Sequence, residues 1–321
     1  MSETIEHTKR ISRRKAFRKG EIHGPDFAFY LLVRTIGVLV VLGFLWIFIS
    51  LYQNSAPLIA ARGWGCLFHL DWDPERGNFG ILSFIYGTIA SSLIALLISV
   101  PIALASGLFL SEIAKGKIRS ATAFLLEMLA AIPSVVFGLW GIFVVVPIVR
   151  NQIQPALSSF FFFLPQFQGP KFGVGIFTAG LILSIMILPT IISVCREVFQ
   201  AIPNTIREAA LGLGATKWEM IKISVLRSST SGILGAVVLG LARALGETMA
   251  VAMLIGNRAE ISKSIFAPGA TMASVIANEY AEASGGLHIA ALSAVGMGLL
   301  AISLIINLLA GMIVARARRF N

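Results

Sequence analysis

Long apolar runs separated by shorter polar segments dominate the pattern of this chain. Six of the runs have at least about the 20 residues that a helix needs to cross the hydrocarbon core of a bilayer. They comprise residues 30–51, 81–110, 121–149, 172–194, 228–256 and 287–315. The pattern therefore predicts an all-α membrane protein with six transmembrane helices.

Three prolines fall inside the predicted spans, Pro101 in the second, Pro133 in the third and Pro189 in the fourth. A proline in a helix removes one backbone donor, and in a membrane the freed acceptor must find a partner in a neighbouring helix. We expect each proline to interrupt its helix and the kinked surface to face protein.

A shorter apolar stretch, Phe160–Phe163, follows the third predicted span. It is too short to cross a bilayer, and a seventh span would reverse the orientation of everything after it. We expect it to be an interfacial or protein-covered piece of the third loop, on the outside.

Composition supports a membrane location, because 56% of the 321 residues are hydrophobic, only 13% are charged and the mean hydropathy is +0.84. The net charge of +10 does not indicate a nucleic-acid partner, since the basic residues lie at the ends of apolar runs and form no solvated face. Eighteen Lys and Arg lie in the two tails and in the second and fourth loops, against six in the other three loops. The positive-inside rule then places both termini in the cytoplasm.

These boundaries divide the chain into three parts. Residues 1–29 form a basic cytoplasmic tail, residues 30–79 form the first span with its external loop, and residues 80–321 form the membrane core. Inside the core, the longest cytoplasmic loop covers about residues 196–229.

This loop has the pattern of two short helices joined by a glycine-containing turn. Asn204 or Thr205 is the candidate N-cap of the first helix and Thr216 that of the second. Gly214 lies in the turn between them, where a residue without a side chain permits conformations closed to others. We expect a helix, a turn and a helix at the membrane surface.

The first of these helices contains Glu208, Ala209 and Ala210, followed after three residues by Gly214. This spacing resembles the EAA loop of type I ABC importer permeases. The resemblance implies that the loop docks on a cytoplasmic ATPase subunit. The family pattern continues with Ile-x-Leu-Pro, whereas this chain has Ser224, Leu226 and Arg227 at the corresponding positions.

The chain contains no G-x-x-x-x-G-K-[ST] phosphate loop. We therefore expect no ATPase site, no cofactor and no metal ion in this chain. Any energy from ATP must reach it through a partner subunit.

The stretch LGLARALGETMAV, residues 239–251, places Arg243 and Glu247 within the fifth predicted span. At a spacing of four residues both side chains lie on one helix face, beside a stripe of small residues at 242, 246 and 250 that permits close helix packing. The pair is either a structural link between helices or a substrate site. A guanidinium directs two parallel donors toward an oxyanion, which suits a tetrahedral anion in transit.

Three segments are similar to the PstC family of phosphate ABC importer permeases, and the likeness covers nearly all of residues 80–315. They are LARALGETMAV at 241–251, LLEMLAAIPSVVFGLWGIF at 125–143 and SVIANEYAEASGGLHIAAL at 274–292. The resemblance implies a heterodimer with a second, PstA-like permease subunit, a PstB-like ATPase dimer at the cytoplasmic loop and an extracytoplasmic PstS-like phosphate-binding protein. It also implies the bacterial inner membrane, and a substrate-pathway role for Arg243 and Glu247.

Glu127 is another charged residue within a predicted span, near the cytoplasmic end of the third. It is a candidate for a gate or for pairing with Arg243, although it lies about 9 Å shallower if both helices stand upright. In the last external loop, Asn278, Glu279 and Glu282 either meet the binding protein or form a solvated acidic helix. Two other functions remain open, a permease for sulfate or molybdate and an ATP-independent ion-coupled carrier.

Overall fold

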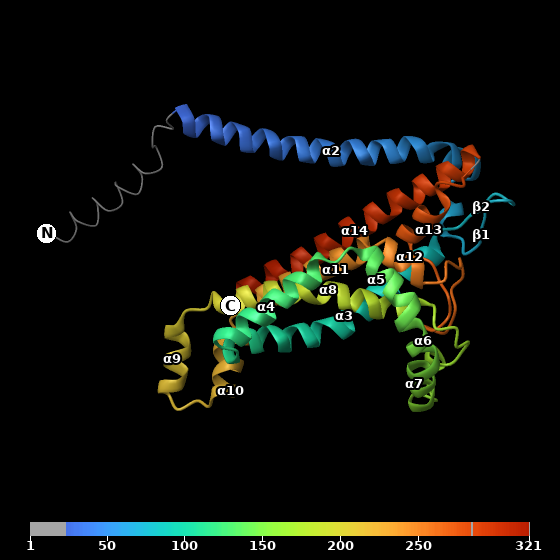
Figure 1. The fold of residues 1–321 in the computed structure, drawn as a ribbon. Coiled ribbons are helices and arrows are strands. Elements are labelled where there is room, and N and C mark those ends of the chain that lie inside the picture. Colours follow the sequence, from blue (N-terminus) through green and yellow to red (C-terminus); the bar gives the residue numbers. More distant parts are fainter. Residues whose placement is uncertain (1–23, 284, 321) are drawn as a thin grey trace. The chain divides into compact units, whose positions relative to one another are not determined.

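The computed structural model describes residues 24–283 and 285–320, and the chain divides into two compact units, Met1–Ser50 and Leu51–Asn321 (Figure 1). Most of the predicted basic tail lies outside the described residues. Unit 1 contains the first part of helix α2 (Gly24–Arg62), which has apolar residues on every face. The remainder of α2 belongs to unit 2.

Long helices account for most of unit 2. They are α3 (Leu82–Leu108), α4 (Gly116–Ala131), α8 (Ile176–Gln200), α11 (Thr230–Gly246) and α14 (Gly286–Phe320). Within the described residues five helical stretches are long and apolar enough to span a membrane, and one bent pair brings the number to six. The predicted all-α membrane fold is confirmed.

Shorter elements connect these helices. They are η2 (Trp64–Phe68), β1 (Trp72–Asp73), β2 (Asn78–Phe79), η3 (Phe109–Ile113), α5 (Ser134–Trp140), η4 (Gly141–Val145), α6 (Val146–Ile148), η5 (Val149–Ile153), α7 (Gln154–Phe160), η6 (Pro165–Phe167), α9 (Asn204–Gly212), α10 (Lys217–Met220), η7 (Ile221–Leu226), α12 (Met249–Leu254) and α13 (Met272–Glu279). Strands β1 and β2 form an antiparallel hairpin in which Trp72 pairs with Phe79.

The third predicted span, residues 121–149, is wrong in its boundaries. The helix breaks between Ala131 and Ser134, because Ile132 is extended before Pro133, a residue that disfavours a helical conformation in its predecessor. The apolar helix that follows runs from Ser134 to Phe160. The expected interruption is therefore found at Pro133. Pro101 and Pro189 lie inside continuous helices, so the interruptions expected at these two prolines are wrong.

The Phe160–Phe163 stretch was expected in an interfacial or protein-covered loop. Phe160 instead ends the apolar helix, and the next three residues form a turn. Phe160, Phe162 and Phe163 are exposed, so within this chain they are not covered by protein.

Helix α8 forms the centre of the larger hydrophobic core, packed against α3, α11 and α12. Small residues of α11 at Gly232, Ala236, Gly240 and Ala244 recur every four positions and lie against α8. A methyl group added at Gly232 would come within 2.4 Å of Val198, and one at Gly240 within 2.6 Å of Ile191. The predicted packing stripe at 242, 246 and 250 is therefore wrong at its first two positions, since Ala242 is only half-buried and Gly246 is exposed. Ala250 is buried and packs against Gly138 of α5.

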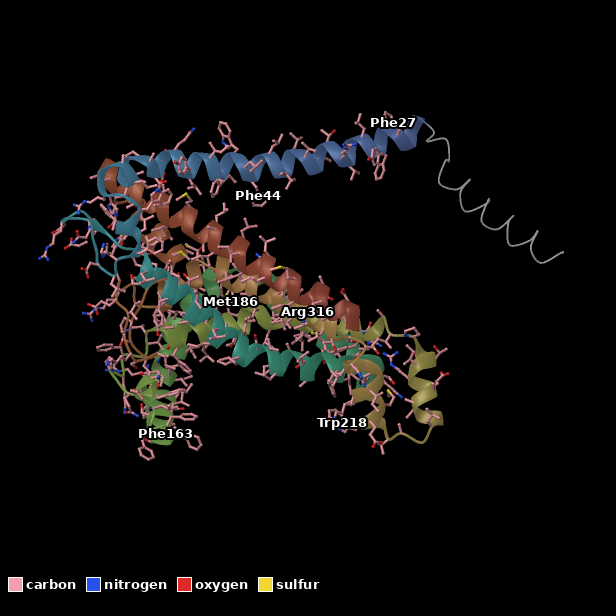
Figure 2. The ribbon with its side chains drawn as sticks, turned by 180° about the vertical axis from the view of Figure 1, so that it is seen from behind. Phe27, Phe44, Phe163, Met186, Trp218 and Arg316 are labelled. Carbon is pink, nitrogen blue, oxygen red and sulfur yellow. The ribbon has the colours of Figure 1, made fainter. Side chains whose placement is uncertain are left out.

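The loop carrying α9 and α10 lies at the same end of unit 2 as the last turns of α14, while the hairpin and α13 lie at the other end (Figure 1). From behind, Trp218 and Phe163 mark these two ends, with Met186 of α8 between them (Figure 2). The α9–α10 loop, which is the candidate coupling loop, and the hairpin are therefore separated by the length of the helices.

Candidate functional site

Arg243 and Glu247 do not share a helix face, contrary to the sequence-based expectation. Helix α11 ends at Gly246, and Glu247 has an extended backbone with φ −71° and ψ 130°. A new helix, α12, begins at Met249. The charged pair thus flanks a break in the predicted fifth span, residues 228–256, and no ion pair joins the two side chains among the described residues.

Arg243 projects from the last turn of α11 with an exposed side chain. Its Nη1 donates to Oγ1 of Thr190 on α8 at 3.2 Å. A guanidinium carries five N–H donors, so this single contact leaves most of them free for a ligand. The charge is held in position without being neutralised.

Thr190 also lines a pocket of about 170 Å³ between α4 and α8. Glu127 of α4 lines the same pocket, opposite Ser193 and Arg196 of α8. Glu127 lies on α4, before the break at Pro133. It is related to Arg243 only indirectly, because Thr190 lines the same pocket as Glu127 and accepts the hydrogen bond from Arg243. No contact joins Glu127 to Arg243 among the described side chains.

The α9–α10 loop, the candidate coupling loop, has well-defined turn chemistry. Helix α9 ends in a Schellman motif. The N–H of Ala215 donates to the carbonyl of Ala210, and the N–H of Gly214 donates to the carbonyl of Leu211. Gly214 has φ +88°, a left-handed conformation that favours glycine. The predicted glycine turn is confirmed.

The predicted caps differ between the two helices of this loop. Thr216 caps α10 in a capping box, because its hydroxyl accepts from the N–H of Glu219 while the Glu219 carboxylate accepts from the N–H of Thr216. Asn204 and Thr205 do not cap α9, which already begins at Asn204 after Pro203. Pro203 itself occupies the N-cap position, with φ −58° and ψ 139°, and its side chain has no oxygen that could accept a capping hydrogen bond.

Arg207 fastens α9 to the rest of unit 2. Its Nη2 lies 2.9 Å from Oε1 of Glu112 and also donates to the carbonyl of Phe199 at 2.7 Å, and both partners of the ion pair are largely buried. At Ser224, one of the departures from the family pattern, the buried hydroxyl donates to the carbonyl of Ile206 at 3.4 Å. The loop is therefore tied to the ends of α3 and α8 by polar contacts.

The outer surface of this loop carries exposed apolar side chains among charged ones. Leu213 is 91% exposed and Trp218 63% exposed, and Glu208 and Ala209 are exposed beside them. Ala210 instead packs against the core. An exposed aromatic and aliphatic surface on a rigid loop has the features of a protein-docking site.

Residues 99–319 match the family model described as binding-protein-dependent transport system inner membrane component. The chain belongs to this family. Its members are permease components, which agrees with the several apolar helices of a multi-pass membrane protein.

Curated relatives of this permease include phosphate transport system permease proteins PstC. The protein from Mesorhizobium japonicum is 40% identical over 88% of this chain and 87% of its own length. The protein from Haemophilus influenzae is 42% identical over 85% and 88%. The "probable" PstC protein from Methanocaldococcus jannaschii is 30% identical over 80% and 84%.

Solved structures with the same fold include two ABC transporters. An inward-facing MetNI methionine ABC transporter superposes with a TM-score of 0.55 at 16% identity, covering 77% of this permease and 99% of that chain. A bacterial alginate ABC transporter in complex with a periplasmic protein bound to an alginate pentasaccharide has a TM-score of 0.54 at 18% identity, covering 92% and 98%. Both establish the type I importer fold of the permease.

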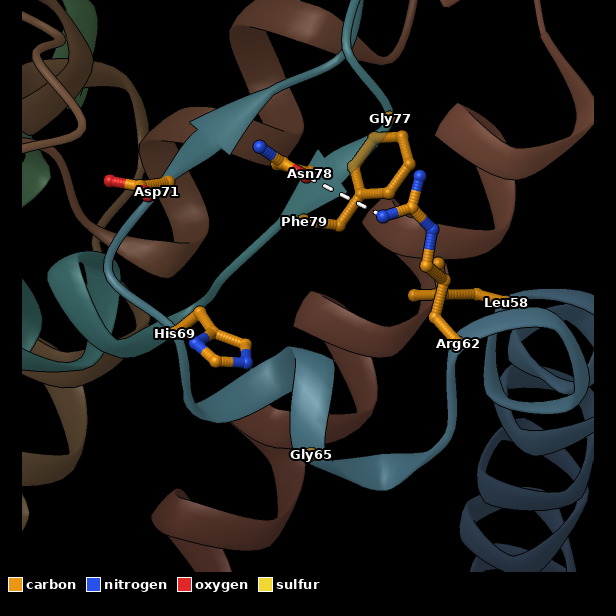
Figure 3. A pocket seen from close by; sticks show the side chains of 8 residues that line it. All are labelled: Leu58, Arg62, Gly65, His69, Asp71, Gly77, Asn78 and Phe79. Atoms are coloured by element: carbon orange, nitrogen blue, oxygen red, sulfur yellow. Dashed lines mark hydrogen bonds between the residues drawn. The ribbon is translucent and has the colours of Figure 1, made fainter.

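A larger pocket, of about 380 Å³, lies at the hairpin end of the permease (Figure 3). Its floor contains buried Leu58 and Phe79, and Arg62 points across it toward Oδ1 of Asn78 at 3.5 Å. It is formed by the end of α2, the segment containing η2 and the hairpin, away from the contact between α8 and α11. Size alone therefore does not identify the transport site.

Glu279, near the hairpin, is occupied by internal contacts. Its carboxylate accepts from Nε1 of Trp72 at 2.9 Å and lies 2.9 Å from Nε2 of His288. Of the three residues considered for contact with a binding protein, Asn278 and Glu282 are exposed and Glu279 is partly buried.

Sequence reasoning missed the α8 side of the pocket. Pro189, Ser193 and Arg196 are spaced at i, i+4 and i+7 and therefore share one face, with Thr190 beside them. This polar face was detectable, but Arg196 lies at the end of an apolar run and was counted only as a topological charge. No comparable signal links Glu112 to Arg207, because these residues are 95 positions apart.

Proposed function

We propose that this chain is the membrane-spanning permease subunit of an ATP-driven importer that moves inorganic phosphate by alternating access. The names of the curated relatives support the substrate. The observation that carries the proposal is Arg243, a permanently charged side chain within a predicted span, whose one hydrogen bond among the described residues goes to a hydroxyl. Placing such a charge in a bilayer is costly unless it faces a partner or a water-filled path.

In this proposal Arg243 binds the phosphate during its passage. Its planar guanidinium offers parallel donors to two oxygens of a tetrahedral anion. Glu247, across the helix break, and Glu127, on α4, are the other pathway residues. Their negative charges compete with the anion for the guanidinium and keep binding weak enough for release.

In this proposal, the energy of ATP hydrolysis by the partner subunit reaches the permease through the loop at residues 196–229. Glu208, Ala209, Ala210 and Gly214 form its coupling segment in this proposal, with Leu213 and Trp218 as the apolar contact to an ATP-binding subunit. Because Arg207 connects α9 to Glu112 and to the end of α8, a displacement of the loop moves α8, one of the two helices that line the pocket.

The proposed assembly has three further protein components and lies in the bacterial inner membrane. The components are a PstA-like second permease subunit in a heterodimer, a PstB-like ATP-binding dimer at the coupling loop and a PstS-like extracytoplasmic phosphate-binding protein. Both termini lie in the cytoplasm, as the distribution of Lys and Arg indicates. The basic tail at 1–29, the first span with its loop at 30–79 and the permease core at 80–321 remain the proposed division of the chain.

Reconstitution of the complete complex in liposomes tests this function. We expect radiolabelled phosphate uptake that requires ATP on the coupling-loop side and phosphate-loaded binding protein on the other. Excess sulfate or molybdate should leave uptake unchanged, and competition by either would assign the permease to that oxyanion. Uptake driven by an ion gradient without ATP would identify an ion-coupled carrier and refute the proposal.

A further inference from the structure

The pocket between α4 and α8 contains a second arginine that the proposed function does not use. Arg196 lines this pocket together with Thr190 and Ser193 from α8 and Glu127 from α4. A volume of about 170 Å³ accommodates several water molecules, or a small ion with part of its hydration shell.

Arg196 has unused hydrogen-bonding capacity at this position. Its Nε is buried and has no hydrogen-bond partner, and no ion pair connects Arg196 to Glu127 among the described residues. The Nη groups of Arg196 also make no hydrogen bond to the described residues, so an oxyanion in the pocket would find charged donors that are not already in use. The two hydroxyls on the same wall add neutral donors.

Thr190 connects this pocket to Arg243. Its hydroxyl oxygen accepts the hydrogen bond from Arg243, and its own proton has no acceptor among the described residues. Thr190 and Arg196 are six residues apart on α8, about 9 Å along the helix axis. An anion leaving Arg243 therefore meets a hydroxyl first and a second guanidinium next, in the direction of the coupling loop.

The same end of α8 is attached to the coupling loop. Arg207 of α9 donates to the carbonyls of Phe199 and Ile202, which follow Arg196 by three and six residues. A movement of α9 therefore acts on the turn of α8 that carries Arg196.

We propose that Arg196, with Thr190, Ser193 and Glu127, forms a second anion site, at which the oxyanion passes from Arg243 and from which it leaves on the coupling-loop side. This inference rests on the proposed function. Two sites of moderate affinity in series allow an ion to advance without being trapped at either. Glu127 faces Arg196 across the pocket and is the negative charge available to replace the departing ion.

Protection of an introduced cysteine tests this site directly. Ser193→Cys is made in the complete complex after Cys66→Ser and Cys195→Ala, and is modified with a small neutral methanethiosulfonate reagent. We expect inorganic phosphate, at constant ionic strength, to slow modification of the introduced thiol. Ser228→Cys, exposed and outside the pocket, is the matched control and should show no protection.

The contribution of Arg196 is isolated by a second substitution. With Arg196→Gln, half-protection should require roughly tenfold more phosphate, as expected for the loss of one charge-assisted contact. Arg227→Gln, an exposed arginine outside the pocket, should leave protection unchanged. Absence of protection in the single Ser193→Cys protein, or full protection after Arg196→Gln, would overturn the second site.

A transport measurement separates a pathway role from a structural one. We expect Arg196→Gln to lower the maximal rate of phosphate uptake with little change in the apparent KM for loaded binding protein, and Arg196→Lys to restore part of the rate. If the unmodified complex imports phosphate but the pocket shows no protection, the second site fails and the importer function stands. If the unmodified complex imports no phosphate, the proposed function itself fails.

Discussion

Arg207 and Arg243 are the same residue type in contrasting surroundings. Arg207 is largely buried, bonds to a carboxylate and donates to backbone carbonyls of the adjoining α8–α9 segment. Arg243 is exposed and donates to one hydroxyl. The first arrangement uses the charge to hold a loop in place, and the second leaves the charge available. The number of satisfied donors therefore distinguishes a structural arginine from a candidate transport residue more clearly than the position in the sequence does.

The largest expected effect on stability comes from breaking the Arg207 arrangement. Glu112→Ala leaves a buried guanidinium without its counter-charge and should destabilise the permease by about 3–5 kcal/mol. The midpoint of thermal unfolding in detergent measures the loss.

Glu260→Ala is the control, because Glu260 pairs with Arg258 in an ion pair whose side chains are more than half exposed and which contributes about 1 kcal/mol or less. A similar loss in both variants would remove the distinction between the two kinds of arginine. Recovery of stability in the double variant Glu112→Leu with Arg207→Met would support it.

Arg243→Gln should have the opposite profile, with a large effect on transport and little on stability. Loss of two charge-assisted hydrogen bonds to the anion predicts a decrease of about 100-fold or more in phosphate uptake. Uptake by the reconstituted complex gives the effect, and copurification of the ATP-binding subunit shows that assembly is intact. Normal uptake would make Arg243 a structural residue like Arg207.

The α9–α10 loop, the proposed coupling loop, depends on backbone geometry in addition to charge. Gly214→Ala places a side chain at φ +88° and should cost about 1–2 kcal/mol locally. We expect a several-fold decrease in the ATP hydrolysis that loaded binding protein stimulates. Gly212→Ala lies in the helix with open space around it, so it should be neutral or slightly stabilising. Equal effects at both positions would mean that the turn has no special role.

The smallest expected effect is at Thr190, whose hydroxyl accepts a hydrogen bond from Arg243. Thr190→Val replaces the hydroxyl with a methyl group of similar size and should reduce phosphate uptake about two- to tenfold. Thr230→Val is the control, since the Thr230 hydroxyl bonds only to carbonyls of the preceding turn. A loss as large as that of Arg243→Gln would show that Thr190 binds the substrate directly and does more than orient the arginine.

The sequence predicted the elements that depend on local chemistry. Apolar run length identified the membrane helices, Gly214 the turn and Thr216 the cap, because each depends on residues within a few positions of one another. The sequence was wrong at the third and fifth predicted spans. Both are long and mostly apolar, which predicts single helices, yet one helix ends at Ala131 before Pro133 and the other ends at Gly246 before Glu247. The first break follows from the proline itself, which disfavours a helical conformation in the preceding residue.

Apolar run length by itself determined that this protein is an all-helical membrane protein, and the EAA loop pattern indicated the permease family to which it belongs. Only the tertiary structure decided which side chains come together: Glu112 bonds to Arg207, Arg243 bonds to Thr190, and Arg196 and Glu127 line one pocket without bonding to each other. The physical reason is that hydrophobicity and turn preferences act over a few residues along the chain. The partners of a charged group are chosen by helices that pack together from distant parts of the sequence.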